Sequence, residues 1–231
     1  MIVAQIDGAV RVITLSRPDK LNALTMAMTV DLLRELRAAM ADPVVKVLLL
    51  HGAGASFCAG KDKAEPGAPV FAALLQSIAE TLMDGPKPVV VAVHGWVVGA
   101  GLEIMLNADI SVAARTARFL LPEARIGLLG TGAVSATLPA AIGLPRAKAM
   151  LMLGRELNAE QAERCGLVSE RVDADDAVPA ALAIAQELAQ RDPTVLAQTK
   201  ALLNRAAIGS VTEALARETA AHEQIGPQTA G

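Results

Sequence analysis

Hydrophobic and polar positions follow a regular succession along the first half of the chain. Residues 2–18 hold two β-rich runs separated by Asp7-Gly8, a pair typical of a two-residue hairpin turn. Residues 24–42 place apolar side chains three and four positions apart with charges between them, which predicts an amphipathic helix. Residues 69–85 repeat that pattern. We therefore expect a hairpin and two amphipathic helices in this part.

Each of the two amphipathic segments is followed by a short, nearly continuous apolar run. Residues 45–52 and 87–95 both end in glycine and are typical of buried parallel strands. Residues 96–109 form a turn and then a helix, and 110–115 and 117–122 are short strands. Strands that alternate with helices predict an α/β fold with a largely parallel sheet.

The pattern becomes mostly helical from about Pro139. Residues 157–166 predict a helix with Asn158 as its N-cap and Gln161 at the third helical position, the signature of a capping box. A final strand is expected over 166–173.

Only helices are expected beyond Asp173, in the amphipathic segments 175–191, 193–209 and 210–224. We expect a core over residues 1–174 that holds the functional site, and a helical region over 175–231 that mediates oligomerisation. An amphipathic tail that closes only a small core is expected to pack on a neighbour.

The composition and charge of the chain argue against several classes of function. The 231 residues carry a net charge of −3, and Lys and Arg are scattered, which argues against a nucleic-acid surface. Aromatic residues make up 2% of the chain and Tyr is absent, so stacking platforms for bases are not expected. No apolar run of membrane-spanning length is free of a charge or a Gly/Pro break.

The two cysteines and the N-terminus bear on the cellular setting. Cys58 and Cys165 lie far apart and offer neither a disulfide framework nor a metal-ligand spacing. The first residues lack the basic region and cleavage site of a signal peptide. We therefore expect a cytoplasmic protein without a metal centre.

Two segments share one design, VLLLHGAGASFCAGKD (47–62) and VVVAVHGWVVGAGLE (89–103). Each runs from a buried strand through a glycine turn and a further glycine into an expected helix. Parallel strands end on the same edge of a sheet, where ligands bind. Glycines allow close backbone approach, and amides at a helix start lack internal partners. The amides of Lys61 and Ala100 are our candidates for an oxyanion hole. On the pattern alone, ordinary Gly-rich turns are the simpler interpretation.

The nearly apolar run over residues 89–110 carries one glutamate, Glu103. Burying a carboxylate without a partner costs several kcal/mol or raises its pKa. An exposed helix face is one explanation. A catalytic pocket is the other, and it requires a second group.

Five motifs together resemble one family. They read RPDKLNAL, SFCAGKD, VHGWVVGAGLEIMLNADI, FLLPEARIGLL and GRELNAEQAERCGLV. Their order and spacing are similar to those of the crotonase family of enoyl-CoA hydratases and isomerases, and the resemblance covers nearly the whole chain. It implies a crotonase-like ββα superhelix with a C-terminal α-helical region, assembled as a trimer or a dimer of trimers.

The resemblance also implies a reaction and its residues. Glu103 and Glu123 match the two catalytic glutamates of hydratases, which add water to a trans-2-enoyl-CoA and give a 3-hydroxyacyl-CoA. The amides of Lys61 and Ala100 match the donors that hold the thioester oxygen. The reaction combines general acid–base catalysis with enolate stabilisation.

The family's CoA-binding stretches match Leu21, Ala23, Ala59 and Asp62. Coenzyme A is part of the substrate, and no metal or separate cofactor is implied. The expected partners are an acyl-CoA and further copies of the chain, with no nucleic acid and no membrane.

Three departures from the family pattern keep other functions open. Ala100 replaces the central glycine of the turn, residues 130–143 lack the usual polar and basic side chains, and the sequence ends without a Phe- and Lys-rich segment. One alternative is a double-bond isomerase that uses Glu123 alone, and the other is a CoA-thioester binding protein with little turnover. The presence of both glutamates favours the hydratase. The glycine order in 95–101 does not fit a dinucleotide-binding motif.

Overall fold

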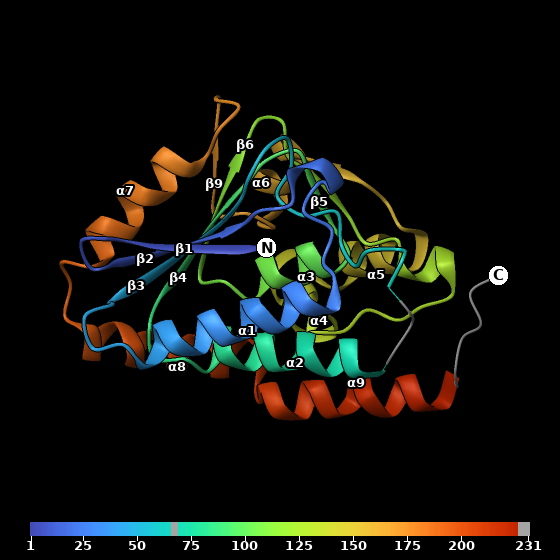
Figure 1. The fold of residues 1–231 in the computed structure, drawn as a ribbon. Helices are drawn as coiled ribbons and strands as arrows, with labels where there is room; N and C mark the ends of the chain where they lie inside the picture. Colours follow the sequence, from blue (N-terminus) through green and yellow to red (C-terminus); the bar gives the residue numbers. More distant parts are fainter. Residues whose placement is uncertain (66–68, 226–231) are drawn as a thin grey trace.

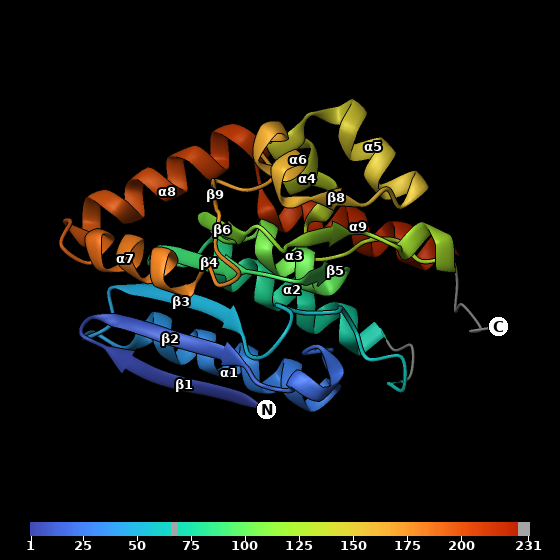
Figure 2. The same ribbon diagram turned by 90° about the horizontal axis from the view of Figure 1, so that it is seen from above.

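The computed structural model describes residues 1–65 and 69–225, and a six-stranded sheet forms its centre (Figure 1). The strands follow one another in the order β1-β2-β3-β4-β6-β9, which Figure 2 shows from above. β1 pairs antiparallel with β2, and the other neighbours pair in parallel, as the sequence predicts. The strands are β1 (Ile2–Asp7), β2 (Val10–Leu15), β3 (Val47–Gly52), β4 (Val89–Val93), β6 (Ile110–Ala114) and β9 (Glu170–Val172).

The N-terminal hairpin is confirmed, with a shifted turn. Asp7 is still the last residue of β1 and pairs with Val10, so the turn consists of Gly8 and Ala9. Gly8 has a φ of 59°, which glycine adopts without strain.

Helices cover both faces of the sheet (Figure 1). α1 (Met26–Ala41), α2 (Pro69–Met83) and α3 (Ala100–Leu106) lie on one side, and α7 (Val178–Leu188) packs against β3, β4 and β6 on the other. Because successive side chains point to opposite faces of a strand, uninterrupted apolar runs suit a sheet that is buried on both sides. Accordingly, Leu48 and Leu50 pack with the first group of helices, whereas Val47 and Leu49 pack with α7.

A second, small sheet has the order β5-β7-β8 and consists of β5 (Trp96–Val98), β7 (Arg118–Leu120) and β8 (Leu157–Asn158). The short strand at β7 is confirmed. β5 and β8 are absent from the sequence-based expectation, because runs of two or three residues show no measurable periodicity.

The remaining helices are η1 (Pro18–Lys20), η2 (Glu123–Ile126), α4 (Val134–Ile142), α5 (Leu144–Leu153), α6 (Ala159–Cys165), α8 (Pro193–Ile208) and α9 (Val211–Ile225). The helical part begins at Val134, earlier than the expected Pro139, which lies inside α4. The capping box of Asn158 and Gln161 is confirmed. The three expected C-terminal helices are present, and α9 lies beside α2 (Figure 1). The division of the chain after residue 174 stays a prediction.

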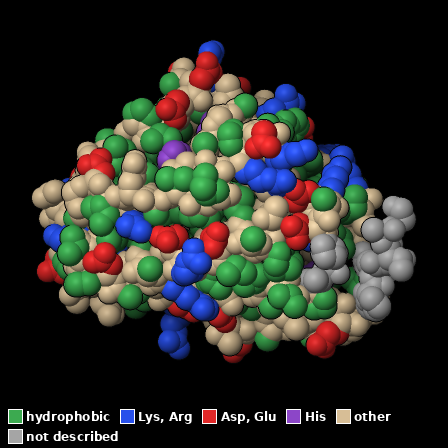
Figure 3. Space-filling model, viewed as in Figure 1, with side chains coloured by type: hydrophobic (Ala, Val, Ile, Leu, Met, Phe, Trp, Pro, Cys, Tyr) green, Lys and Arg blue, Asp and Glu red, His purple; other side chains and the backbone are tan. Residues whose placement is uncertain are grey.

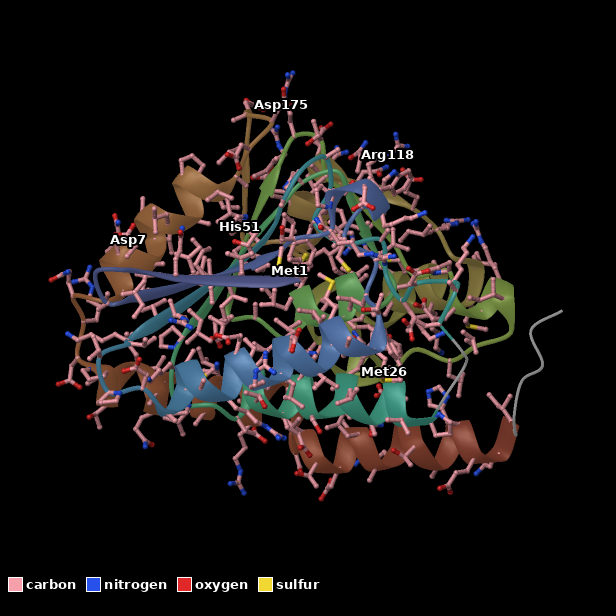
Figure 4. All side chains as sticks on the ribbon, in the orientation of Figure 1. Met1, Asp7, Met26, His51, Arg118 and Asp175 are labelled. Carbon is pink, nitrogen blue, oxygen red and sulfur yellow. The ribbon has the colours of Figure 1, made fainter. Side chains whose placement is uncertain are left out.

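The parallel strands direct their following loops to one edge of the sheet. Asp7, at the hairpin turn, and Arg118 of β7 lie on opposite sides of the view in Figure 4. β2 begins beside that turn, and β3 and β4 run parallel to it, so their carboxyl ends point away from the turn. In the described part of the chain, no helix is both long and apolar enough to cross a membrane.

Candidate active site

The loops that follow β3 and β4 lie side by side. Cys58 forms an isolated parallel bridge with Val97 of β5. The amide of Cys58 donates to the carbonyl of Trp96 at 3.0 Å, and the amide of Val98 donates to the carbonyl of Cys58 at 2.9 Å. The two glycine-punctuated segments with the shared design are therefore neighbours, as the parallel sheet predicts.

A third stretch, which follows β2, completes this edge, and it carries two of the four residues matched to CoA binding, while the loop after β3 carries the other two. The amide of Ala59 donates to the carbonyl of Leu21 at 2.9 Å, and the amide of Asp62 donates to the carbonyl of Leu24 at 2.9 Å. Ala23 lies between those two carbonyls in sequence and is half-buried. The structure thus brings Leu21, Ala23, Ala59 and Asp62 together.

Asn22 fixes this third stretch from within, and sequence reasoning gave it no role. Its side chain is fully buried, and its amide nitrogen donates to the carbonyls of Ala53 and Ser56, each at 2.8 Å. Its oxygen accepts from the amide of Arg17 at 2.8 Å. The available signal was a polar residue between leucines in the LNAL motif, where burial demands hydrogen-bond partners.

The side chains of Lys61 and Asp62 are engaged locally. Lys61 Nζ donates to the carbonyl of Glu65 at 2.6 Å. Asp62 Oδ2 forms an ion pair with Arg17 Nη1 at 2.5 Å. A hydrogen bond from the amide of Ala64, followed by the one from Arg17, lowers the pKa of Asp62. Because both side chains already have partners, the backbone groups of Lys61 and Asp62 are the ones available to a thioester.

The amides of Lys61 and Ala100 are free of partners within residues 1–65 and 69–225. Ala100 is the first residue of α3, where an amide has no acceptor in its own helix. A methyl group built on Gly60 would lie 3.8 Å from the nitrogen of Ala100 and 3.0 Å from the carbonyl oxygen of Val98. The backbone before Lys61 therefore runs close to the start of α3, and the φ of 90° at Gly60 suits glycine.

Glu103 lies in the first turn of α3 with 3% of its surface exposed. Its Oε1 accepts from the amide of Thr131 at 2.8 Å. Burial, followed by the charge of Glu123, raises the pKa of Glu103 well above its usual value, and the charge of Glu218 acts in the same direction. The hydrogen bond from Thr131 opposes the shift. The exposed-helix explanation for this glutamate is therefore wrong.

Glu123 begins η2 and directs its carboxylate to the start of α3. A methyl group on Gly99, the N-cap of α3, would lie 2.7 Å from Glu123 Oε1. Burial raises the pKa of Glu123 to about 7, against a small lowering by its own backbone amide. Glu123 Oε2 and Thr131 Oγ1 are buried and have no hydrogen-bond partner among the described residues. Most buried polar atoms in proteins have a partner, so these two atoms are available for a bound water molecule or a ligand.

The arrangement has a definite chemical capability. The charge of each carboxyl group disfavours ionisation of the other, so a state with one protonated and one ionised group is favoured, and such a pair can act as an acid and a base. Two free amides that converge on one oxygen stabilise negative charge there. The edge of the sheet therefore holds residue types that can transfer protons and backbone amides that can stabilise an oxyanion.

No group of three His, Cys, Asp or Glu side chains could hold a metal ion in residues 1–65 and 69–225. A cleft of about 510 Å³ lies over α4, α5 and α6, and neither Glu103 nor Glu123 lines it. The candidate site with Glu103 and Glu123 therefore lies apart from this cleft.

Comparison with known sequences gives a consistent result. A family model described as enoyl-CoA hydratase/isomerase matches residues 5–230. The chain is 32% identical over 215 residues to the 1,2-epoxyphenylacetyl-CoA isomerase of Escherichia coli (strain K12), covering 89% of this chain and 82% of that relative. It is 33% identical over 213 residues to the 2,3-dehydroadipyl-CoA hydratase of the same strain, covering 90% and 84%.

Comparison with solved structures agrees. The structure is similar to the crystal structure of an enoyl-CoA hydratase from Mycobacterium avium subsp. paratuberculosis K-10, with a TM-score of 0.90 and 30% sequence identity. The match covers 98% of this chain and 90% of the other. The crotonase-like fold predicted from the sequence motifs is therefore confirmed.

Proposed function

The chain belongs to the enoyl-CoA hydratase/isomerase family, and on that premise we propose that it hydrates a trans-2-enoyl-CoA to a 3-hydroxyacyl-CoA. One observation carries the choice of hydration. Two carboxyl groups, the buried Glu103 and the half-buried Glu123, interact across the start of α3, and the pKa of each is raised. Adding water across a C=C bond needs a base for the water and an acid for the α-carbon, and this pair supplies both.

The reaction divides between the two halves of the site. A water molecule held by the two carboxyl groups loses a proton to the ionised one as its oxygen bonds to the β-carbon. The protonated carboxyl group gives its proton to the α-carbon. In between, negative charge collects on the thioester oxygen, which accepts hydrogen bonds from the amides of Lys61 and Ala100. The proposed reaction uses no metal and no cofactor beyond the coenzyme A of the substrate.

The coenzyme A part of the substrate is proposed to pass along Leu21, Ala23, Ala59 and Asp62. These residues come from two chain segments that are hydrogen-bonded to each other. Leu21 is exposed, whereas Ala23, Ala59 and Asp62 are half-buried, so the segment pair is open to solvent on one side. Backbone carbonyls and small side chains at this edge leave room for an extended thioester chain.

A double-bond isomerase is the second candidate, because the family that the chain matches includes enoyl-CoA isomerases as well as hydratases. In that reaction Glu123 would carry a proton from one carbon to another without adding water. A CoA-thioester binding protein with little turnover is the third.

The deciding experiment presents the protein with a panel of 2-enoyl- and 3-enoyl-CoA thioesters and identifies the products by mass. We expect a gain of one water on 2-enoyl substrates. An unchanged mass with a moved double bond would establish the isomerase instead. No product from any thioester, with binding retained, would establish the binding protein. The matched control is the double variant Glu103→Gln/Glu123→Gln.

We also propose a homotrimer or a dimer of trimers. Apolar side chains are exposed on α5 and α8, among them Leu144, Met152, Leu202 and Leu203. In Figure 3, apolar side chains are interspersed with charged ones over the face where α1, α2 and α9 lie in Figure 1. Light scattering is expected to give the mass of three or six chains, and a monomer at micromolar concentration would contradict the proposal. A cytoplasmic location stays a prediction.

A further inference from the structure

Glu218 is a buried carboxylate on α9 that the proposed reaction does not use. It is 5% exposed. Its Oε2 accepts from the amide of Ala133 at 2.9 Å, and its Oε1 accepts from the amide of Ser135 at 2.9 Å and from its hydroxyl group at 2.7 Å. Three donors from one short stretch therefore converge on one carboxylate from a distant helix.

The stretch that Glu218 holds is the start of α4. Ala133 is the N-cap of this helix and has no side chain that can accept from the first amides. Those amides have no partner within their own helix, and a carboxylate stabilises a helix N-terminus. Ala133 also has a φ of 67°, which a non-glycine residue keeps only where surrounding contacts impose it. Glu218 supplies both the missing cap and those contacts.

The same stretch holds Glu103. The amide of Thr131, next to Gly132 and Ala133 in the chain, donates to Glu103 Oε1 at 2.8 Å. Asn107, at the end of α3, donates to the carbonyl of Gly132 at 2.9 Å. Glu103 therefore receives a hydrogen bond from a backbone turn that is fixed on one side by α3 and on the other by Glu218.

We propose that Glu218 is a positioning residue of the hydration reaction, which fixes the turn of residues 131–135 and through it the carboxylate of Glu103. The inference rests on the proposed function. The charged groups that act on Glu103 are Glu123 of η2 and Glu218 of α9. Glu218 thus influences Glu103 by geometry and by charge without touching the substrate.

The first test is the substitution Glu218→Gln, with Glu223→Gln as the matched control. Gln has one acceptor oxygen and presents an N–H group where a donor already lies, so the turn loses part of its support. We expect kcat for hydration to fall about 10- to 100-fold, as misplacement of a catalytic group does, with KM changed less than about twofold. Glu223 is exposed on the same helix, and its substitution leaves both values unchanged. Equal rates for Glu218→Gln and wild type would overturn the proposal.

The second test separates positioning from general damage. If Glu218 acts through Glu103, then Glu218→Gln lowers the rate little further in a protein that already carries Glu103→Gln, because residues that act as a unit are not additive. We expect the two residual rates to agree within about threefold. A full multiplicative loss would mean that Glu218 acts elsewhere, and the proposal would be wrong. If Glu218→Gln does not fold, Glu218→Asp, which keeps the charge, is measured in the same two backgrounds.

A third measurement keeps this inference distinct from the proposed function. Backbone amide exchange over residues 128–137 is compared in wild type and Glu218→Gln. Faster exchange confined to this stretch supports the positioning role, and unchanged exchange overturns it. If the wild-type protein adds water to no thioester of the panel, the proposed function fails, and exchange alone decides whether Glu218 holds the turn.

Discussion

The amides of Lys61 and Ala100 and the carboxylates of Glu103 and Glu123 reach the candidate site by different routes. The amides belong to the backbone and are placed by strand-like hydrogen bonds in the loop after β3 and at the end of β5. The carboxylates are side chains, and Glu103 is held by a turn that follows much later in the chain. Both halves therefore depend on contacts between distant segments, but the oxyanion half is placed by hydrogen bonds between backbones, whereas the carboxylate half is placed by the burial and hydrogen bonding of side chains.

The two halves also differ in their response to substitution and pH. A backbone amide survives the replacement of its side chain by any residue except proline. A carboxylate is lost when its side chain is replaced, and its charge depends on burial and on its neighbours. Substitutions of the two glutamates therefore test proton transfer, whereas substitutions by proline test the backbone amides.

The largest expected effect tests the carboxylate half. Glu103→Gln and Glu123→Gln keep size but cannot exchange a proton, so each is expected to lower kcat for hydration about 100- to 10,000-fold. The double variant is expected to lose far less than the product of the two, because the pair works as a unit. Steady-state rates on one 2-enoyl-CoA check this, while binding of a substrate analogue survives in all three variants.

Asymmetry between the single variants would change the interpretation. Loss of double-bond migration in Glu123→Gln, with Glu103→Gln barely affected on a 3-enoyl substrate, would indicate the isomerase. Hydration at the wild-type rate by Glu103→Gln would contradict the two-glutamate mechanism.

A somewhat smaller effect tests the oxyanion half. Lys61→Pro deletes one donor and is expected to lower kcat about 100- to 1000-fold, the usual loss for such a group. Lys61→Ala keeps the amide and removes only a side chain that contacts the carbonyl of Glu65, so most of kcat remains. Rates for both variants are measured beside circular dichroism spectra that confirm folding. Equal inactivity of the two would show that the side chain of Lys61 is needed.

The smallest expected effect concerns pH and stability. Folding raises the pKa of Glu123 from 4.5 to about 7 through burial, so the folded chain binds its proton more tightly than the unfolded chain does. This contribution is fully present below pH 4.5 and is lost as the pH rises toward 7. The wild type is therefore expected to lose on the order of 1–3 kcal/mol of unfolding free energy over that range, relative to Glu123→Gln. Urea unfolding of both proteins at pH 4.5 and pH 7 checks the difference. An equal change of unfolding free energy between the two pH values in wild type and Glu123→Gln would contradict the prediction.

Much of the framework is predictable from neighbouring residues. The uninterrupted apolar runs at β3 and β4, the helical periodicity of α1 and α2, and the capping box of Asn158 all express local rules, and the structure confirms them. The second sheet is not predictable in this way, because β5 and β8 gain their strand character only by pairing with β7. The motifs around Glu103 and Glu123 indicate the family but not how either side chain is held.

The alternating α/β order, the family and the choice of Glu103 and Glu123 as candidates follow from the sequence alone, because periodicity and motif spacing reside in consecutive residues. The burial of Glu103 against the amide of Thr131, 28 positions away, and the capping of Ala133 by Glu218, 85 positions away, become visible only in the folded chain. It likewise gave Asn22 its carbonyl partners. Such contacts depend on the path of the whole chain, and a polar residue finds its partner only after packing has excluded water from both.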